Sequence, residues 1–205
     1  MSRTRLLLAA AAVALLLVGI GAGAGERGRR TSGAWVLLEP VAGALASAQW
    51  VRVDAAFAAG DDARGFALAE TALALDPGAT TGWELLVDHQ LRALASPLRE
   101  PDPERRAAWV RSGLATAERG LGSARAPGDL ALDAGIGLLV LLEAEELPAW
   151  PGDRAGLEAV AVDWLVRAGD LGSAVGAELA RALVERGTGQ DAEPERDPGP
   201  SQDGG

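Results

Sequence analysis

Cysteine, lysine, asparagine and tyrosine are absent from the 205 residues, and His89 is the only histidine. The lack of cysteine excludes disulfides, thiolate metal ligands, a thiol nucleophile and a lipid-anchoring cysteine. The lack of lysine excludes a P-loop lysine and a Schiff-base lysine. A single imidazole argues against histidine-based catalysis and against a multi-histidine metal site. The missing residue types are typical of codon bias in a GC-rich, bacterial genome.

Positive charge is also scarce. All 19 basic residues are arginines, and 29 acidic residues oppose them, which gives a net charge of −10 and a pI near 4.6. This balance has the wrong sign for a nucleic-acid partner. Aromatic residues make up only 4% of a chain that is 48% hydrophobic, while alanine, leucine and arginine recur throughout. These proportions predict a folded, all-α protein.

Residues 1–24 have the features of a membrane or export segment. Arg3 and Arg5 precede an uninterrupted apolar run at residues 6–24, which as a helix would extend about 28 Å, close to the thickness of a hydrocarbon core. This length favours an uncleaved single-pass anchor, with the bulk of the chain outside the cytoplasm. Small residues at Ala22 and Ala24 also fit a signal-peptidase site, so secretion after cleavage at Ala24 is the alternative.

The rest of the chain divides into three parts. Residues 25–40 are predicted to be a linker, and the proline-, glycine- and acid-rich residues 188–205 a disordered acidic tail. Between them, a domain at residues 41–187 contains signals for seven helices and none for a strand. These helices are expected at residues 41–59, 62–75, 81–95, 103–119, 129–146, 153–169 and 171–186.

A repeat pattern lies in residues 60–86. Helical hairpins that stack on one another need a small residue at the turn, small residues where the helices approach, and a stop before the next pair. The segment supplies these features in order with Gly60, Ala69, Ala72, Pro77, Trp83 and Leu86. These positions resemble the tetratricopeptide repeat. The resemblance implies antiparallel helical hairpins stacked as a short α-solenoid over about residues 42–187.

The pattern is degenerate elsewhere. A second match occurs at residues 168–171, with Ala174 at the close-packing position after the turn. Gly65, however, stands where the repeat usually has alanine, Gln90 stands where it has an aromatic residue, and Trp50 is displaced by one position. A compact helical bundle built from the same hairpins is therefore the alternative fold.

Candidate chemistry is sparse. Glu84, Asp88 and Arg92 are four residues apart and share one face of a predicted helix, with His89 beside them. This arrangement could contact a polar ligand or supply an acid/base group, and a solvated charge ladder is the simpler interpretation. No serine lies in a nucleophile motif, and no glycine-rich loop follows a strand. We therefore expect no catalytic residues, no cofactor and no metal site.

In the repeat register, the first helix of each hairpin lines the concave surface. That surface would carry Trp50, Asp54, Phe57, Glu84, Asp88 and Arg92. An aromatic and acidic groove suits an extended peptide that is basic or of mixed charge. The sequence therefore predicts a non-enzymatic protein-interaction scaffold or adaptor, tethered at the bacterial cell envelope. The alternatives are a carboxylate-using envelope enzyme or accessory subunit, and a structural oligomerisation module.

Overall fold

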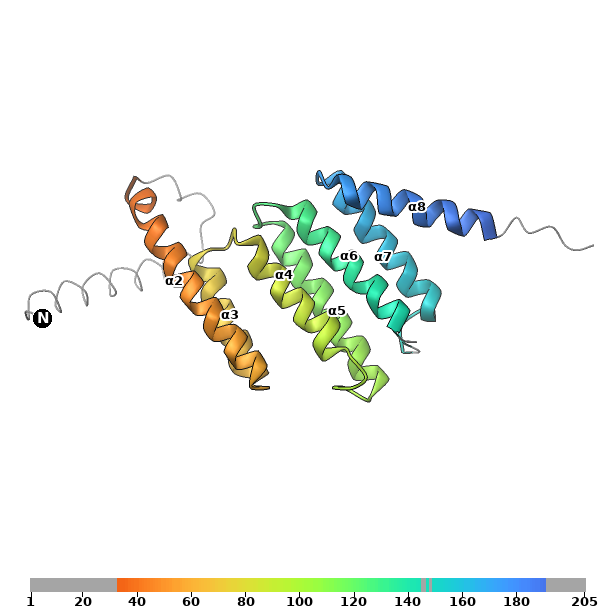
Figure 1. Cartoon of the computed structure of the whole chain (residues 1–205), viewed down its shortest axis with the longest axis horizontal. Coiled ribbons are helices and arrows are strands. Elements are labelled where there is room, and N and C mark those ends of the chain that lie inside the picture. The colour runs from red at the N-terminus through yellow and green to blue at the C-terminus, as the bar shows by residue number, and fades with distance from the viewer. Residues whose placement is uncertain (1–32, 145–146, 148, 191–205) are drawn as a thin grey trace, which may run out of the picture. The chain divides into compact units, whose positions relative to one another are not determined.

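The computed structural model describes residues 33–144, 147 and 149–190, and within these residues it is all-helical, with no strand, as predicted (Figure 1). The predicted anchor or signal segment, 1–24, and residues 191–205 of the predicted tail lie outside the described residues. None of the described helices combines the length and hydropathy that a membrane crossing requires. The helices are α2 (Gly33–Ala58), α3 (Asp62–Leu75), α4 (Thr80–Asp88), the π-helix η2 (His89–Leu94), α5 (Pro103–Leu121), α6 (Pro127–Ala144), α7 (Asp153–Asp170) and α8 (Ala174–Gln190).

Some helices begin and end at the residues that the sequence predicts, and others do not. α3 spans the predicted residues, and Asp102 caps α5 by accepting a hydrogen bond from the Glu104 amide at 2.9 Å. Residues 33–40 of the predicted linker 25–40 are helical, because α2 begins at Gly33. At the other end α8 extends to Gln190, so the first residues assigned to the acidic tail are helical.

The start of α4 also differs from the prediction. The helix expected from residue 81 begins at Thr80, and its N-cap is Ala79, which has no side-chain hydrogen bond. Thr80 instead accepts a hydrogen bond from the Ala126 amide through Oγ1 at 3.0 Å, and the Arg125 amide donates to the Gly78 carbonyl at 3.1 Å. These bonds hold the start of α4 against the loop that leads into α6.

The chain divides into two compact units at Pro77 and Gly78, and each is described by itself. In the first unit, α2 and α3 form a helical hairpin with the predicted turn at Gly60, whose φ of +75° suits glycine. Its core is built mainly from alanine, which lets the helices approach closely. The buried apolar residues are Ala46, Val53, Ala56, Ala69, Ala72 and Leu73.

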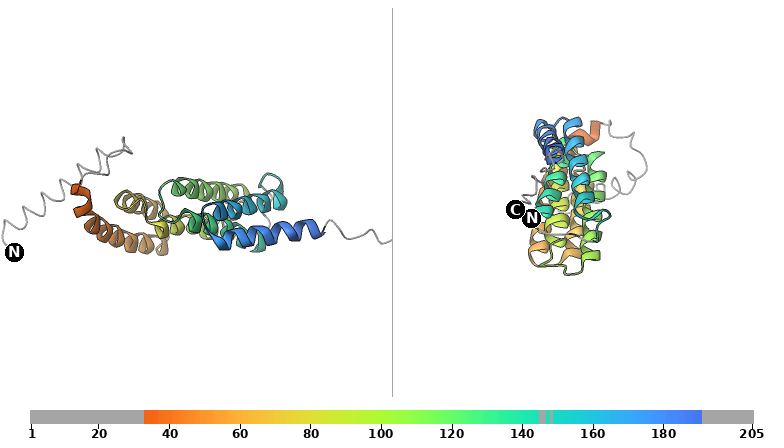
Figure 2. Two further views of the ribbon diagram at one scale, coloured as in Figure 1. Left: turned by 90° about the horizontal axis from the view of Figure 1, so that it is seen from above. Right: turned by 90° about the vertical axis from the view of Figure 1, so that its right-hand side faces the viewer.

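The second unit contains two hairpins, α4–η2–α5 and α6–α7, followed by α8. Its helices form two layers when seen from above (Figure 2), with α4 packed beside α6. An ion pair ties α5 to α7, where Arg167 Nη1 lies 2.8 Å from Glu118 Oε2. Stacked hairpins are thus present inside this unit, and a continuous solenoid across both units stays a prediction. The largest fully buried side chains here are Leu86, Leu91, Leu130, Leu138, Leu157, Leu165, Val87 and Val110.

The π-helix follows from the spacing of the buried residues. Between residues 82 and 95 the buried positions repeat every four residues, at 82, 86, 90 and 94 and at 83, 87, 91 and 95. In an α-helix of 3.6 residues per turn, such a stripe would drift by about 120° over twelve residues. The wider turn of η2, whose C-cap Ala95 donates to the Gln90 carbonyl five residues back at 3.1 Å, keeps the stripe on one side.

Candidate binding surface on the second unit

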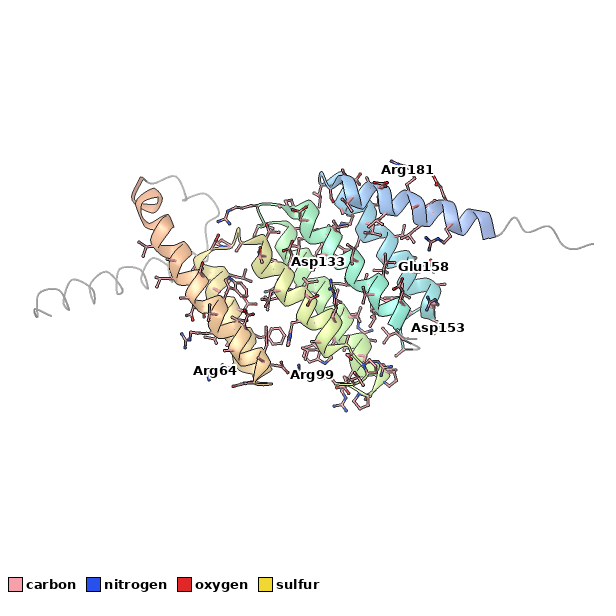
Figure 3. The ribbon with its side chains drawn as sticks, in the orientation of Figure 1. Arg64, Arg99, Asp133, Asp153, Glu158 and Arg181 are labelled. Carbon is pink, nitrogen blue, oxygen red and sulfur yellow. The ribbon has the colours of Figure 1, made fainter. Side chains whose placement is uncertain are left out.

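Arg92 joins two helices of the second unit. Its Nε lies 2.7 Å from Asp88 Oδ1 at the end of α4, and its Nη2 lies 3.2 Å from Asp133 Oδ1 on α6. Figure 3 labels Asp133 at this junction. Glu84 lies one turn before Asp88 and its charge interacts with that of Asp133. We refer to Glu84, Asp88, Arg92 and Asp133 as the Arg92 cluster.

Glycine on α6 allows this junction to form. Gly137 follows Asp133 by four residues and therefore lies on the same face of α6. A Cβ built on Gly137 would lie 3.0 Å from Leu91 Cδ1 and 4.0 Å from Arg92 Nε. The absence of a side chain at Gly137 thus brings η2 close enough to α6 for Arg92 to reach Asp133.

The surroundings of the cluster raise the pKa values of two of its carboxyl groups, Asp133 and Glu84. Burial raises the pKa of Asp133, an effect that Arg92 opposes and Asp88 reinforces. Burial also raises the pKa of Glu84, with further contributions from the charges of Asp133 and Asp129. Asp133 Oδ2 is buried and has no hydrogen-bond partner among the described residues. The acidic groups outnumber Arg92, so the cluster presents net negative charge that a cationic group could neutralise.

The other predicted groove residues lie on α2, in the first unit. Asp54 is exposed, and Trp50 is half-buried, with an indole Nε1 that finds no partner within the described part of the chain. Phe57 packs edge-on against Phe66, with ring centroids 5.4 Å apart, and its ring also contacts Gly65, where a side chain would collide with it. Phe57 therefore stabilises the α2–α3 hairpin, and a groove that joins both units stays a prediction.

Asp129 and Asp133, both on α6, are not among the site residues predicted from the sequence. Asp129, Asp133 and Gly137 are spaced by four residues, as Glu84, Asp88 and Arg92 are. The same test of spacing, applied to α6, would have identified this second polar face, although not its contact with Arg92.

The chemical groups of the Arg92 cluster are three carboxyl groups and one guanidinium. Within residues 33–144, 147 and 149–190, no group of three histidine, cysteine, aspartate or glutamate side chains could hold a metal ion. Ser112 is engaged with Gln90, whose Nε2 lies 3.0 Å from Ser112 Oγ between η2 and α5. The arrangement can therefore recognise charge, and we find no nucleophile beside a base in it.

Comparison with known proteins assigns no family. No family model, curated protein or solved structure matches this chain.

Proposed function

We propose that this chain is a non-enzymatic interaction module, tethered at the bacterial cell envelope by residues 1–24, that binds a basic segment of a partner protein through the Arg92 cluster. The observation that carries the proposal is the bridge from Arg92 to Asp133, because it places acidic residues of α4 and α6 on one continuous surface. A tetratricopeptide-like arrangement would use this same surface, lined by the first helices of neighbouring hairpins.

The charges of the cluster favour a cationic ligand. Glu84 and Asp133 are partly buried, and their pKa values are raised because burial and neighbouring acids disfavour the ionised forms. An arginine or lysine from a partner would reduce this repulsion by pairing with the accessible carboxylate of Asp88. Such a contact supplies specificity for basic over acidic segments, with an affinity that falls as salt is added.

Peptide binding to the full chain tests this proposal. The probe is an array of ten-residue peptides of graded net charge, titrated against the detergent-solubilised protein at several salt concentrations. We expect basic peptides to bind best, and we expect Asp88→Arg or Glu84→Arg to weaken that binding about tenfold, since each reverses a charge in the cluster. Asp163→Arg, at an exposed position on α7, is the matched control.

Two results would reject the proposal. One is a preference for acidic or neutral peptides, and the other is binding that Asp88→Arg and Asp163→Arg reduce equally. Asp54→Arg on α2 adds a separate test of the longer predicted groove. A loss of affinity with this variant would extend the binding surface to the first unit, whereas unchanged affinity would limit it to the second.

A further inference from the structure

A groove separates α8 from the helices beneath it. It has a volume of about 280 Å³, and its apolar lining comes from α6 and α8. Charged residues Glu143, Arg154, Glu158 and Arg186 surround that lining. Figure 3 labels Glu158 on α7 below α8. The apolar lining residues are Leu139, Leu142, Leu179, Ala182 and Leu183.

α8 is fixed on one side and exposed on another. A Cβ built on Gly176 would lie 2.5 Å from Ala168 Cβ, and one built on Gly169 would lie 2.9 Å from Ala177 Cβ, so α7 and α8 pack closely near their turn. Toward its C-terminal end, α8 borders the groove. Val175 remains 55% exposed, and helical spacing places it on the same stripe as Ala182.

Residues 191–205 do not have the composition to cover this groove. They contain Ala192 as their only apolar side chain, together with prolines at 194, 198 and 200. Prolines at this spacing oppose a helix, and a single alanine cannot fill a pocket lined by leucines.

The charges along α8 are complementary to those of a second, antiparallel copy of α8. Glu178, Ala182 and Arg186 are spaced by four residues and therefore share one face, with the small residue midway between opposite charges. If two copies of α8 cross antiparallel at Ala182, Glu178 of each copy faces Arg186 of the other. A parallel crossing would instead place like charges together, which is unfavourable.

We infer that the Val175–Ala182 stripe of α8 and the adjoining groove bind a second copy of this chain, forming a two-fold symmetric dimer with antiparallel α8 helices. Such an interface uses the same surface on both subunits, as closed dimers do. Alanine at the crossing point permits close approach of the helices, and the pairing covers exposed Val175 and the leucines of the groove. This interface is separate from the Arg92 cluster.

Cysteine cross-linking tests the inference directly, because the natural chain contains no cysteine. In Ala182→Cys the two introduced thiols meet at the symmetry axis, within the range that a disulfide requires. The full-length variant, in membranes of its expression host, is treated with copper phenanthroline and analysed by non-reducing electrophoresis and mass spectrometry. Val184→Cys is the matched control, because Val184 lies on the opposite side of α8 and is 52% exposed.

We expect Ala182→Cys to form a covalent homodimer at least about fivefold more efficiently than Val184→Cys. Equal cross-linking of the two variants would overturn the inference. A cross-linked product whose mass identifies a different protein would also overturn it, because that protein would then be the occupant of the groove.

A charge swap tests the same interface without a covalent bond. Dimerisation of the detergent-solubilised full chain is measured by sedimentation over a range of concentrations. We expect Glu178→Arg or Arg186→Glu alone to weaken the dimer about fivefold or more, since each change places like charges at both symmetry-related contacts. The double variant should recover an affinity within about twofold of the natural chain. Absence of this recovery would refute the antiparallel pairing of Glu178 with Arg186.

Discussion

Gly120 on α5 lies directly against the indole ring of Trp83 on α4. A Cβ built on Gly120 would be 3.0 Å from Trp83 Cγ and Cδ2, and 2.5 Å from Leu130 Cδ2 on α6. The guanidinium of Arg119 covers the same indole at 5.5 Å from the ring centroid. The absence of a side chain at Gly120 thus lets Trp83 fill the space where α4, α5 and α6 meet.

We predict that Gly120→Ala destabilises the protein by about 1–3 kcal/mol, because the added methyl overpacks this junction. Chemical denaturation followed by tryptophan fluorescence measures the effect. Gly122→Ala is the control at the end of the same helix, where an added Cβ would be 3.8 Å from its nearest neighbour, the Arg119 carbonyl oxygen. Equal stability losses for the two variants would contradict the assigned packing.

The raised pKa values of Asp133 and Glu84 predict how stability depends on pH. A carboxyl group whose pKa is higher in the folded chain binds its proton more tightly when folded. These two groups therefore increase stability as pH falls from neutral through their folded pKa values, and the gain ends below the unfolded values near about 4.

Asp133→Asn removes one of these titrations while keeping the shape of the side chain. We expect the variant to be more stable than the natural chain at pH 7, because burial of the charged carboxylate outweighs its attraction to Arg92. The difference should shrink as the pH approaches 4. Urea denaturation at several pH values measures it, and a variant that is less stable at pH 7 would show that the bond to Arg92 dominates.

Gln90 is a polar side chain in the core of the second unit. It is 6% exposed, its Nε2 bonds to Ser112 Oγ, and its Oε1 has no partner among the described residues. We predict that Gln90→Met raises the free energy of unfolding by about 1 kcal/mol, because it removes the unsatisfied carbonyl and preserves the side-chain volume. Thermal unfolding measures the gain. Ser112→Ala should have the opposite effect, since it leaves the amide of Gln90 without its bond.

Arg106 anchors the loop between η2 and α5. It is 8% exposed, and its Nη1 donates to the carbonyls of Glu100 at 3.2 Å and Pro101 at 3.1 Å. We predict that Arg106→Ala costs about 2–3 kcal/mol and makes the loop susceptible to proteases at Leu98, which is 97% exposed. Limited proteolysis with mass spectrometry detects the cleavage.

Arg105→Ala provides the comparison for Arg106. The side chain of Arg105 is 69% exposed and forms surface ion pairs of 3.4 Å with Glu100 and 3.3 Å with Asp102. Its removal should cost less than about 1 kcal/mol. If both arginine variants lose the same stability and are cut at the same rate, the buried contacts of Arg106 do not hold the loop.

Local signals in the sequence were sufficient to predict the helices and most of the positions at which they begin and end. Gly60 and the pair Asp102–Pro103 act through backbone geometry and neighbouring amides, so their positions follow from a few adjacent residues. The start of α4 at Thr80, by contrast, is held by a distant contact, in which the Ala126 amide donates to Thr80 Oγ1. A contact of this kind depends on which helices pack together, and a local pattern does not contain that information.

The candidate binding surface was also predictable only in part, because spacing within one helix can be read from the sequence and contacts between helices cannot. The shared face of Glu84, Asp88 and Arg92 follows from helical spacing alone. The bond from Arg92 to Asp133 joins residues 41 positions apart and depends on the close approach of η2 to α6 at Gly137. The ring of Phe57 packs where Gly65 has no side chain, a contact within the α2–α3 hairpin that helical spacing does not reveal, and its place on a binding surface stays a prediction.

The wide turn of η2 couples the interior of the second unit to its surface. The buried stripe and the ladder of Glu84, Asp88 and Arg92 both advance by four residues, so one backbone distortion aligns them together. If the same residues wound as an ordinary α-helix, both patterns would drift around the helix by about 40° for every four residues. Arg92 would then turn away from Asp133, and buried leucines would become exposed in the same step. Loss of one residue would remove about 100° of this drift, so a chain shorter by one residue here would keep both faces aligned without a π-helix.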